Sequence, residues 1–149
     1  VGESVRIAYI SDKSYRQVDR RFFKANQRVG FADGFPVLLT NDASLSDLNG
    51  RLDEPVCMSR FRSNIVFSGD QAYQEDAWER VRIGDVVFEL VKPCGRCSMI
   101  TINSEAEKTK EPLKTLSSYR KNEFGVCFGQ NLVHRSNGQI KVGDKLVVL

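Results

Sequence analysis

With 149 residues, 41% of them hydrophobic and 28% charged, the chain has the length and composition of one globular domain. A run of about 18 apolar residues is absent, which excludes a membrane-spanning helix. The net charge of +3 is too small for the dense basic surface of a protein that binds nucleic-acid polymers, although it suits a small anionic ligand.

Four cysteines without a secretion signal favour reduced thiols and a cytoplasmic location. The chain begins with Val1 and not with methionine, so we expect it to be a fragment of a longer protein.

Strands and one helix are expected in the first third of the chain. Alternating apolar residues predict a strand at 5–10, and a short apolar run predicts a buried strand at 35–40. The polar, glycine-containing stretch 11–34 between them is typical of a loop. Residues 41–49 begin with polar capping residues and continue with leucines three apart, which predicts a short helix that ends at Gly50.

The rest of the chain is again rich in strands. Residues 61–67 predict one strand, and residues 81–91 predict two strands that reverse at a Gly-Asp pair. Residues 140–149 repeat that second design. Pro112 followed by two leucines predicts a helix that ends at Tyr119. The sequence therefore predicts a β-rich α+β fold over residues 1–149, in which a mixed or antiparallel sheet forms a barrel-like domain with few short helices.

The motif Cys94-Gly-Arg-Cys97 has several possible functions. A disulfide-exchange motif needs its first cysteine at a helix N-terminus, but the residues after Cys97 favour a strand. A zinc site or an iron–sulfur cluster needs further ligands at close spacing, and Cys57, Cys127 and His134 are isolated. A structural role as small buried side chains remains open for both cysteines of the motif.

The residues around the motif favour a different role for it. Lysine and proline precede Cys94, and glycine and arginine separate it from Cys97. A rigid cationic turn stabilises a thiolate and suits a neighbouring anion. This pattern favours a loop that presents one thiolate to a bound group.

Five blocks of the sequence resemble the MOSC domain, which is named for the C-terminal part of molybdenum cofactor sulfurases. Their order and spacing are similar to those of bacterial proteins that detoxify N-hydroxylated bases and of mitochondrial amidoxime-reducing components. The resemblance extends from about Val29 to Leu149. The blocks are FADGFPVLLTNDASLSDLN, RFRSNIVFSG, EDAWERVRIGDVVFELVKPCGRC, EPLKTLSSYR and FGQNLV…GQIKVGDKLVVL.

The resemblance implies a β-rich fold that holds a molybdenum–pyranopterin cofactor. It implies that Cys97 is the metal ligand and that Cys94 is not, which is consistent with thiolate as a soft ligand. Arginine side chains suit the cofactor's phosphate because a guanidinium binds phosphate with two hydrogen bonds. Pyridoxal phosphate is a further cofactor associated with the family. The implied contacts to the molybdenum cofactor are Asn41, Ser44, Arg62, Asn64, Arg96 and Asn131.

Three other residues are assigned no catalytic part. Ser63 stands where the family commonly has proline, and Trp78 is expected to pack in the core. The single histidine, His134, is expected at the surface of a strand.

The activity implied by the resemblance is reduction of N-hydroxylated small molecules or bases, from N–OH to N–H with loss of water. Electrons would come from a ferredoxin-like domain or a flavin reductase, with no membrane partner. The resemblance also implies that an N-terminal β-rich segment precedes this fragment and that a ferredoxin-like domain can follow it. The alternative is a module without catalytic activity, which carries sulfur or cofactor for another enzyme.

Overall fold

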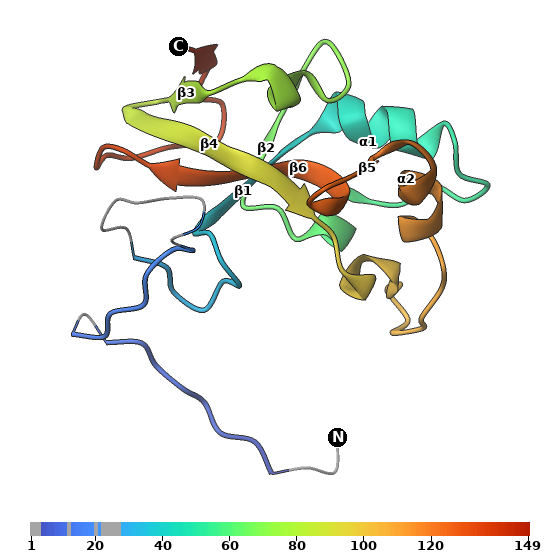
Figure 1. Cartoon of the computed structure of the whole chain (residues 1–149), viewed down its shortest axis with the longest axis horizontal. Coiled ribbons are helices and arrows are strands. Elements are labelled where there is room, and N and C mark those ends of the chain that lie inside the picture. Colours follow the sequence, from blue (N-terminus) through green and yellow to red (C-terminus); the bar gives the residue numbers. More distant parts are fainter. Residues whose placement is uncertain (1–3, 12, 20, 22–27) are drawn as a thin grey trace.

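The computed structural model describes residues 4–11, 13–19, 21 and 28–149 (Figure 1). The strands are β1 (Val37–Asn41), β2 (Ile65–Phe67), β3 (Arg80–Ile83), β4 (Val86–Gly95), β5 (Lys121–Asn122), β6 (Gly125–His134) and β7 (Leu146–Val148). The helices are α1 (Asp42–Asn49) and α2 (Leu113–Tyr119), with the short 3₁₀ helices η1 (Met58–Phe61), η2 (Gln74–Ala77) and η3 (Ser98–Thr101). None of the helices in this described part is long and apolar enough to span a membrane.

The strands form one mixed sheet in the order β2-β1-β6-β4-β3-β7, and β5 pairs with β6 beside this path. Only β1 and β2 run parallel among the described pairs; the others are antiparallel. The sheet curls into a nearly closed barrel, with the long strands β4 and β6 at its centre (Figure 1). A pocket of about 810 Å³ is lined by residues of both edge strands, β2 and β7. The predicted β-rich fold is confirmed.

The pairing of β4 with β6 is irregular near the end of β4. Its register shifts between Leu90 and Lys92 and again between Pro93 and Gly95. Such irregularities bend a strand and increase its local twist. The end of β4, which carries the cysteine motif, is therefore bent out of the regular ladder.

Apolar side chains gather in three clusters. One fills the barrel and includes Leu39, Val81, Phe88 and Leu132. A second lies under the N-terminal segment around Val29 and Val133. The third packs the helices against β6, and in it the rings of Phe61 and Phe128 stack with centroids 3.9 Å apart. This third cluster lies beneath the residues that carry the candidate site. Outside this cluster, Trp78 packs beside Phe67 at the border of the barrel core as expected, with 5.2 Å between ring centroids.

Local sequence signals placed several elements correctly. The helix expected at 41–49 is α1, with Asn41 as its N-cap and Gly50 as its C-cap. The two strands expected within 81–91 are β3 and β4, which reverse at a turn with positive φ at Gly84. The helix expected after Pro112 is α2.

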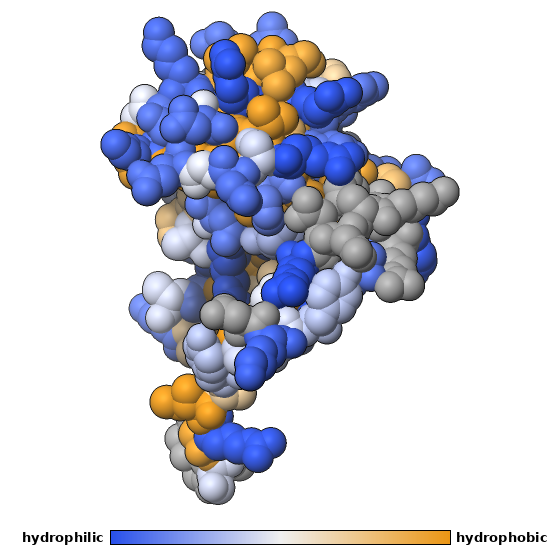
Figure 2. Space-filling model, turned by 90° about the vertical axis from the view of Figure 1, so that its left-hand side faces the viewer, coloured by the Kyte–Doolittle hydropathy of each residue, from blue (hydrophilic) through white to orange (hydrophobic). Residues whose placement is uncertain are grey.

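Other expectations were wrong. Residues 5–10 form no strand; they lie in an exposed extended tail whose apolar side chains are visible at the lower end of Figure 2. A strand needs a neighbour for its backbone hydrogen bonds, and the described residues supply none to this segment. Residues 61–67 form only the three-residue β2, and residues 140–149 form only β7. The strand expected after Cys97 is the 3₁₀ helix η3.

Candidate functional site

The site begins where β4 ends. At Gly95 the strand approaches the hairpin before β6 so closely that a Cβ atom would lie under 3.0 Å from the Phe124 carbonyl oxygen. The Arg96 amide then donates to the Val126 carbonyl at 2.7 Å. Cys97 follows with extended backbone, is exposed, and is the N-cap residue of η3. Among the described residues, its thiol has no hydrogen-bond partner.

Arg96 does not have a free guanidinium group. Its Nη2 donates to the Phe61 carbonyl at 2.7 Å, and its Nη1 donates to the Cys94 sulfur at 3.1 Å. The remaining nitrogen, Nε, is buried and has no partner within the described structure. Arg96 therefore joins the turn that contains Cys94 and Cys97, the cysteine turn, to η1. Its guanidinium contacts the sulfur of Cys94, although Cys97 is its neighbour in the sequence.

Arg62 lies on the turn to which Arg96 is bonded. It follows Phe61 directly, caps η1 with a left-handed backbone (φ 54°), and is exposed. The strand predicted at 61–67 does not include Arg62, because the chain turns here before β2 begins. Within the described residues its guanidinium has no partner. The structure thus places a free thiol and a free guanidinium on two turns that are bonded to each other.

Asn64 and Asn131 use part of their hydrogen-bonding capacity within the sheet. The backbone N–H of Leu38 donates to Asn64 Oδ1 at 2.8 Å, and the backbone N–H of Asn64 donates to the Leu38 carbonyl at 3.1 Å. Asn131 Nδ2 lies 3.4 Å from the Pro93 carbonyl, which it contacts from β6. Asn64 Nδ2 and Asn131 Oδ1 have no hydrogen bond to the described residues, so each can still contact a ligand.

Ser63, which replaces the proline common in the family, also has a defined partner. The Thr40 hydroxyl donates to Ser63 Oγ at 2.8 Å, which joins β1 to the turn of Arg62. This hydroxyl bond holds the turn at a position where proline would restrict the backbone.

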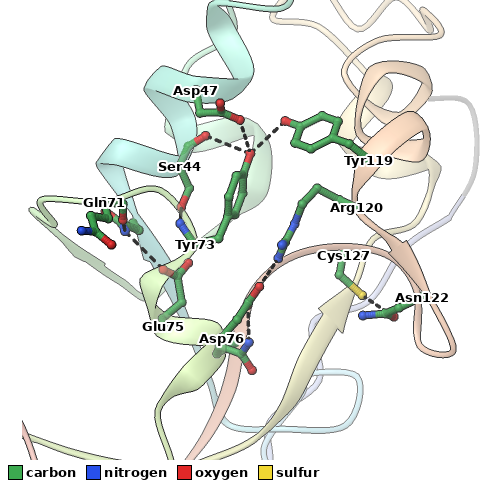
Figure 3. Close-up of polar contacts among 12 residues, drawn as sticks. Ser44, Asp47, Gln71, Tyr73, Glu75, Asp76, Tyr119, Arg120, Asn122 and Cys127 are labelled. Carbon is green, nitrogen blue, oxygen red and sulfur yellow. Dashed lines mark hydrogen bonds and ion pairs between the residues drawn. The ribbon is translucent and has the colours of Figure 1, made fainter.

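Asn41 and Ser44 are completely buried. Asn41 accepts from the Ala43 amide at 3.0 Å and donates to the Gln71 carbonyl at 2.8 Å. Ser44 Oγ accepts from the Tyr73 amide at 2.8 Å. These contacts attach the segment before η2 to the start of α1 (Figure 3). Their side chains are engaged in the fold, in contrast to those of Cys97 and Arg62.

A polar cluster that sequence reasoning did not find adjoins this segment (Figure 3). The hydroxyl of Tyr73 donates to Asp47 at 3.0 Å and lies 2.8 Å from the hydroxyl of Tyr119. The neighbouring Arg120 forms an ion pair of 2.6 Å with Asp76. These bonds connect α1, η2 and α2 across the sequence. A signal for it in the sequence is the acidic pair Glu75-Asp76, which lies just before Trp78.

Burial and the Arg51 guanidinium shift the pKa values of this cluster in opposite directions. Glu75 is 1% exposed, its Oε1 has no partner among the described residues, and burial raises its pKa. Burial also raises the pKa of Tyr73, while the Arg51 guanidinium lowers the pKa of Asp47. The hydroxyl of Tyr73 is thereby kept protonated beside an ionised carboxylate, which is the arrangement that a stable hydrogen bond needs.

The available donor set fits a group that needs a single protein ligand. Within the described residues no three His, Cys, Asp or Glu side chains gather as a metal site, and all four cysteines are free thiols. A metal held mainly by its own cofactor needs only one thiolate from the protein, and the exposed Cys97 can supply it. The free Arg62 suits the cofactor's phosphate. The residues present therefore fit a molybdenum–pyranopterin group.

Fold and site together define a small, nearly closed β-barrel domain that presents one thiol and one cation beyond a bent strand. The MOSC domain model matches residues 26–147, so the chain belongs to the MOSC domain family.

Similar proteins extend this result. Mitochondrial amidoxime-reducing component 1 of Homo sapiens is 39% identical over 137 residues, which are 85% of this chain and 41% of the relative. Molybdenum cofactor sulfurase of Oryza sativa is 34% identical over 147 residues, 87% of this chain and 18% of the relative. The crystal structure of YiiM from Geobacillus stearothermophilus shares the fold, with a TM-score of 0.58 and 14% identity over 77% of this chain and 54% of that one. The chain thus spans less than half the length of the two curated relatives, the amidoxime-reducing component and the sulfurase.

Proposed function

We propose that this domain binds a molybdenum–pyranopterin cofactor and forms part of an oxidoreductase that reduces N-hydroxylated compounds. The observation that carries the proposal is the exposed thiol of Cys97 and the exposed guanidinium of Arg62, both without a partner among the described residues, on two turns that the Arg96–Phe61 hydrogen bond joins. The similarity to amidoxime-reducing components over 85% of the chain supports the reaction class.

Each residue has a defined part in this proposal. Cys97 supplies the thiolate that holds the metal, and Arg62 binds the anionic end of the cofactor. The unbonded ends of Asn64 and Asn131 donate to or accept from its polar ring edges. Asn41, Ser44 and Arg96 act on the cofactor indirectly, because their side chains hold the surrounding segments in place.

When bound, the cofactor supplies the redox centre at which N–OH becomes N–H and water, a change that consumes two electrons and two protons. Those electrons come from a reductant of the flavin or iron–sulfur class, either a partner protein or another domain. The substrates proposed are N-hydroxylated small molecules or bases. The cytoplasmic location stays a prediction, as does pyridoxal phosphate binding, and the names of the relatives point to mitochondria as an alternative location.

The test is to express the chain in cells that make the cofactor and to measure molybdenum and pterin per chain. Cys97→Ser is compared with Cys57→Ser, which alters another exposed thiol outside the proposed site. We expect near-stoichiometric molybdenum in the unaltered chain and in Cys57→Ser, and loss of metal in Cys97→Ser with an unchanged unfolding midpoint. Full metal content in Cys97→Ser would show that Cys97 is not the ligand.

Turnover distinguishes the oxidoreductase from the alternative, a sulfur-carrying or cofactor-carrying module, which the similarity to molybdenum cofactor sulfurase favours. The loaded domain is given a chemically reduced viologen dye and benzamidoxime, and the amidine product is measured. Amidine formation that Cys97→Ser abolishes supports the reductase. A fully loaded domain without turnover supports the carrier. If the chain is isolated without metal, the same measurements are repeated on a longer form that extends upstream.

A further inference from the structure

The two free groups of the site lie on short elements that cannot hold their own position. Arg62 follows η1 and Cys97 precedes η3, and each of these 3₁₀ helices has four residues. Helices of this length are poorly hydrogen-bonded and take their position from their surroundings. What joins η1 to η3 therefore decides how the thiol and the guanidinium lie relative to each other.

Arg60, a residue of η1 that has no part in the proposed cofactor contacts, reaches the far side of the cysteine turn. Its Nε donates to the Ile100 carbonyl of η3 at 2.9 Å, and its Nη2 donates to the Glu111 carbonyl at 3.2 Å. The side chain is half-buried between these segments. A guanidinium holds two such acceptors at once because its donors are fixed in one plane.

Arg96 makes the reverse connection. It precedes Cys97 and donates to the carbonyl of Phe61, the last residue of η1. One arginine thus reaches from η1 to η3, and the other reaches from the start of the cysteine turn back to η1. Cys97 lies between the two anchored positions, Arg96 and Ile100, and Arg62 directly follows the anchored Phe61.

We propose that Arg60 is a positioning residue, which together with Arg96 fixes the Cys97 thiol relative to the Arg62 guanidinium. The inference rests on the proposed function in assigning Cys97 to the metal and Arg62 to the cofactor's anionic end. Arg60 touches neither the cofactor nor the substrate. Its effect is to remove the freedom of η3 to move against η1.

The experiment compares three variants with the unaltered chain. Arg60→Gln removes the two-acceptor connection, and Arg60→Lys keeps the charge with a single donor group. Val81→Ala, a substitution in the barrel core away from the two turns, serves as the control for general loss of stability. Hydrogen exchange of residues 97–102 is measured without cofactor, and molybdenum retained after gel filtration is measured in protein from cofactor-producing cells.

Arg60→Gln should raise exchange in 97–102 by about tenfold, the effect of losing the charge-assisted hydrogen bond to the Ile100 carbonyl, which is the one of the two Arg60 bonds that reaches this segment. Exchange in β1 and β6 should change far less. Molybdenum retention should fall, with Arg60→Lys between Arg60→Gln and the unaltered chain. Val81→Ala should lower the unfolding midpoint. Its exchange in 97–102 and its retained molybdenum should lie closer to those of the unaltered chain than those of Arg60→Gln do.

The failure of the positioning role of Arg60 and the failure of the proposed function give different results. If Arg60→Gln changes exchange in 97–102 no more than Val81→Ala does, or retains as much molybdenum as the unaltered chain, Arg60 is not a positioning residue. If the unaltered chain and its longer form both lack molybdenum, the proposed function fails, and the exchange data still decide whether Arg60 fixes the turn.

Discussion

Gly95 allows β4 to approach the hairpin before β6, and replacing it should displace the candidate site. In Gly95→Ala, the new Cβ would lie under 3.0 Å from the backbone carbonyl oxygen of Phe124, which cannot rotate away as a side chain could. The end of β4 must then move from its pairing with Cys127. Overpacking that shifts backbone costs about 1–3 kcal/mol, and this rigid contact places Gly95→Ala near 3 kcal/mol.

The assay is urea unfolding, with Gly34→Ala as the matched control. An added Cβ at Gly34 meets nothing within 4 Å, so that variant should lie within about 0.5 kcal/mol of the unaltered chain. For Gly95→Ala a loss of about 3 kcal/mol corresponds to a melting temperature about 6–12 °C lower. Equal midpoints and slopes for the two variants would refute the reasoning, because the close approach at Gly95 would then carry no energetic cost.

Three further predictions concern single side chains. Burial raises the pKa of Glu75 above its ordinary 4.5. Between the unfolded-state pKa and the raised folded-state pKa, the folded state therefore holds a proton that the unfolded state has lost. The free energy of unfolding falls as pH rises through this interval. Glu75→Gln should therefore gain stability relative to the unaltered chain between acidic and neutral pH in urea unfolding, and a pH-independent difference would contradict this. Arg62→Asn should change the free energy of unfolding by no more than about 0.5 kcal/mol, because asparagine tolerates a left-handed backbone. The same variant should bind the cofactor about 10–100-fold more weakly, measured as molybdenum retained on dilution. Tyr119→Phe removes the hydroxyl contact to Tyr73 and should cost about 0.5–1.5 kcal/mol by urea unfolding, without loss of molybdenum.

Elements encoded by local signals could be predicted, while those that depend on distant partners could not. The capping asparagine and the leucines of α1 lie within the helix that they specify. Strand β6 is central and buried along most of its length, so it lacks the alternation of apolar and polar residues by which a strand is recognised. It also contains Gly129, where an added Cβ would meet the Leu39 carbonyl of β1. That glycine reflects strand packing that the sequence alone does not display.

The segment 5–10 shows the opposite case. Its alternation is favourable for a strand, but in the structure it extends away from the barrel with its apolar side chains exposed (Figures 1 and 2). Intrinsic preference for extended backbone does not create the neighbouring strand that must supply hydrogen bonds.

The sequence and its resemblance named candidate site residues but did not separate those with free side chains from those engaged in the fold. Residue type alone cannot show that Asn41 is occupied by the Gln71 carbonyl, since that bond crosses 30 positions of the chain. The same holds for the Arg96 guanidinium, whose acceptor at Phe61 lies 35 positions away. Of the two arginines that the resemblance implies as cofactor contacts, Arg96 is engaged, and Arg62 keeps a guanidinium without a partner among the described residues.

The geometry of an extended chain accounts for the different surroundings of the two cysteines. Residues two apart point to the same side of an extended segment, so Arg96 can reach Cys94, and it does so at 3.1 Å. Cys97 has extended backbone, with φ −96° and ψ 177°, so we expect its side chain on the other side of the segment, and its thiol makes no hydrogen bond to that guanidinium. The arginine in the motif therefore binds one cysteine to the turn and leaves the other exposed. Exchanging the order of glycine and arginine would remove this distinction, because an arginine at position 95 would lie on the opposite side from Cys94 and meet the Phe124 carbonyl.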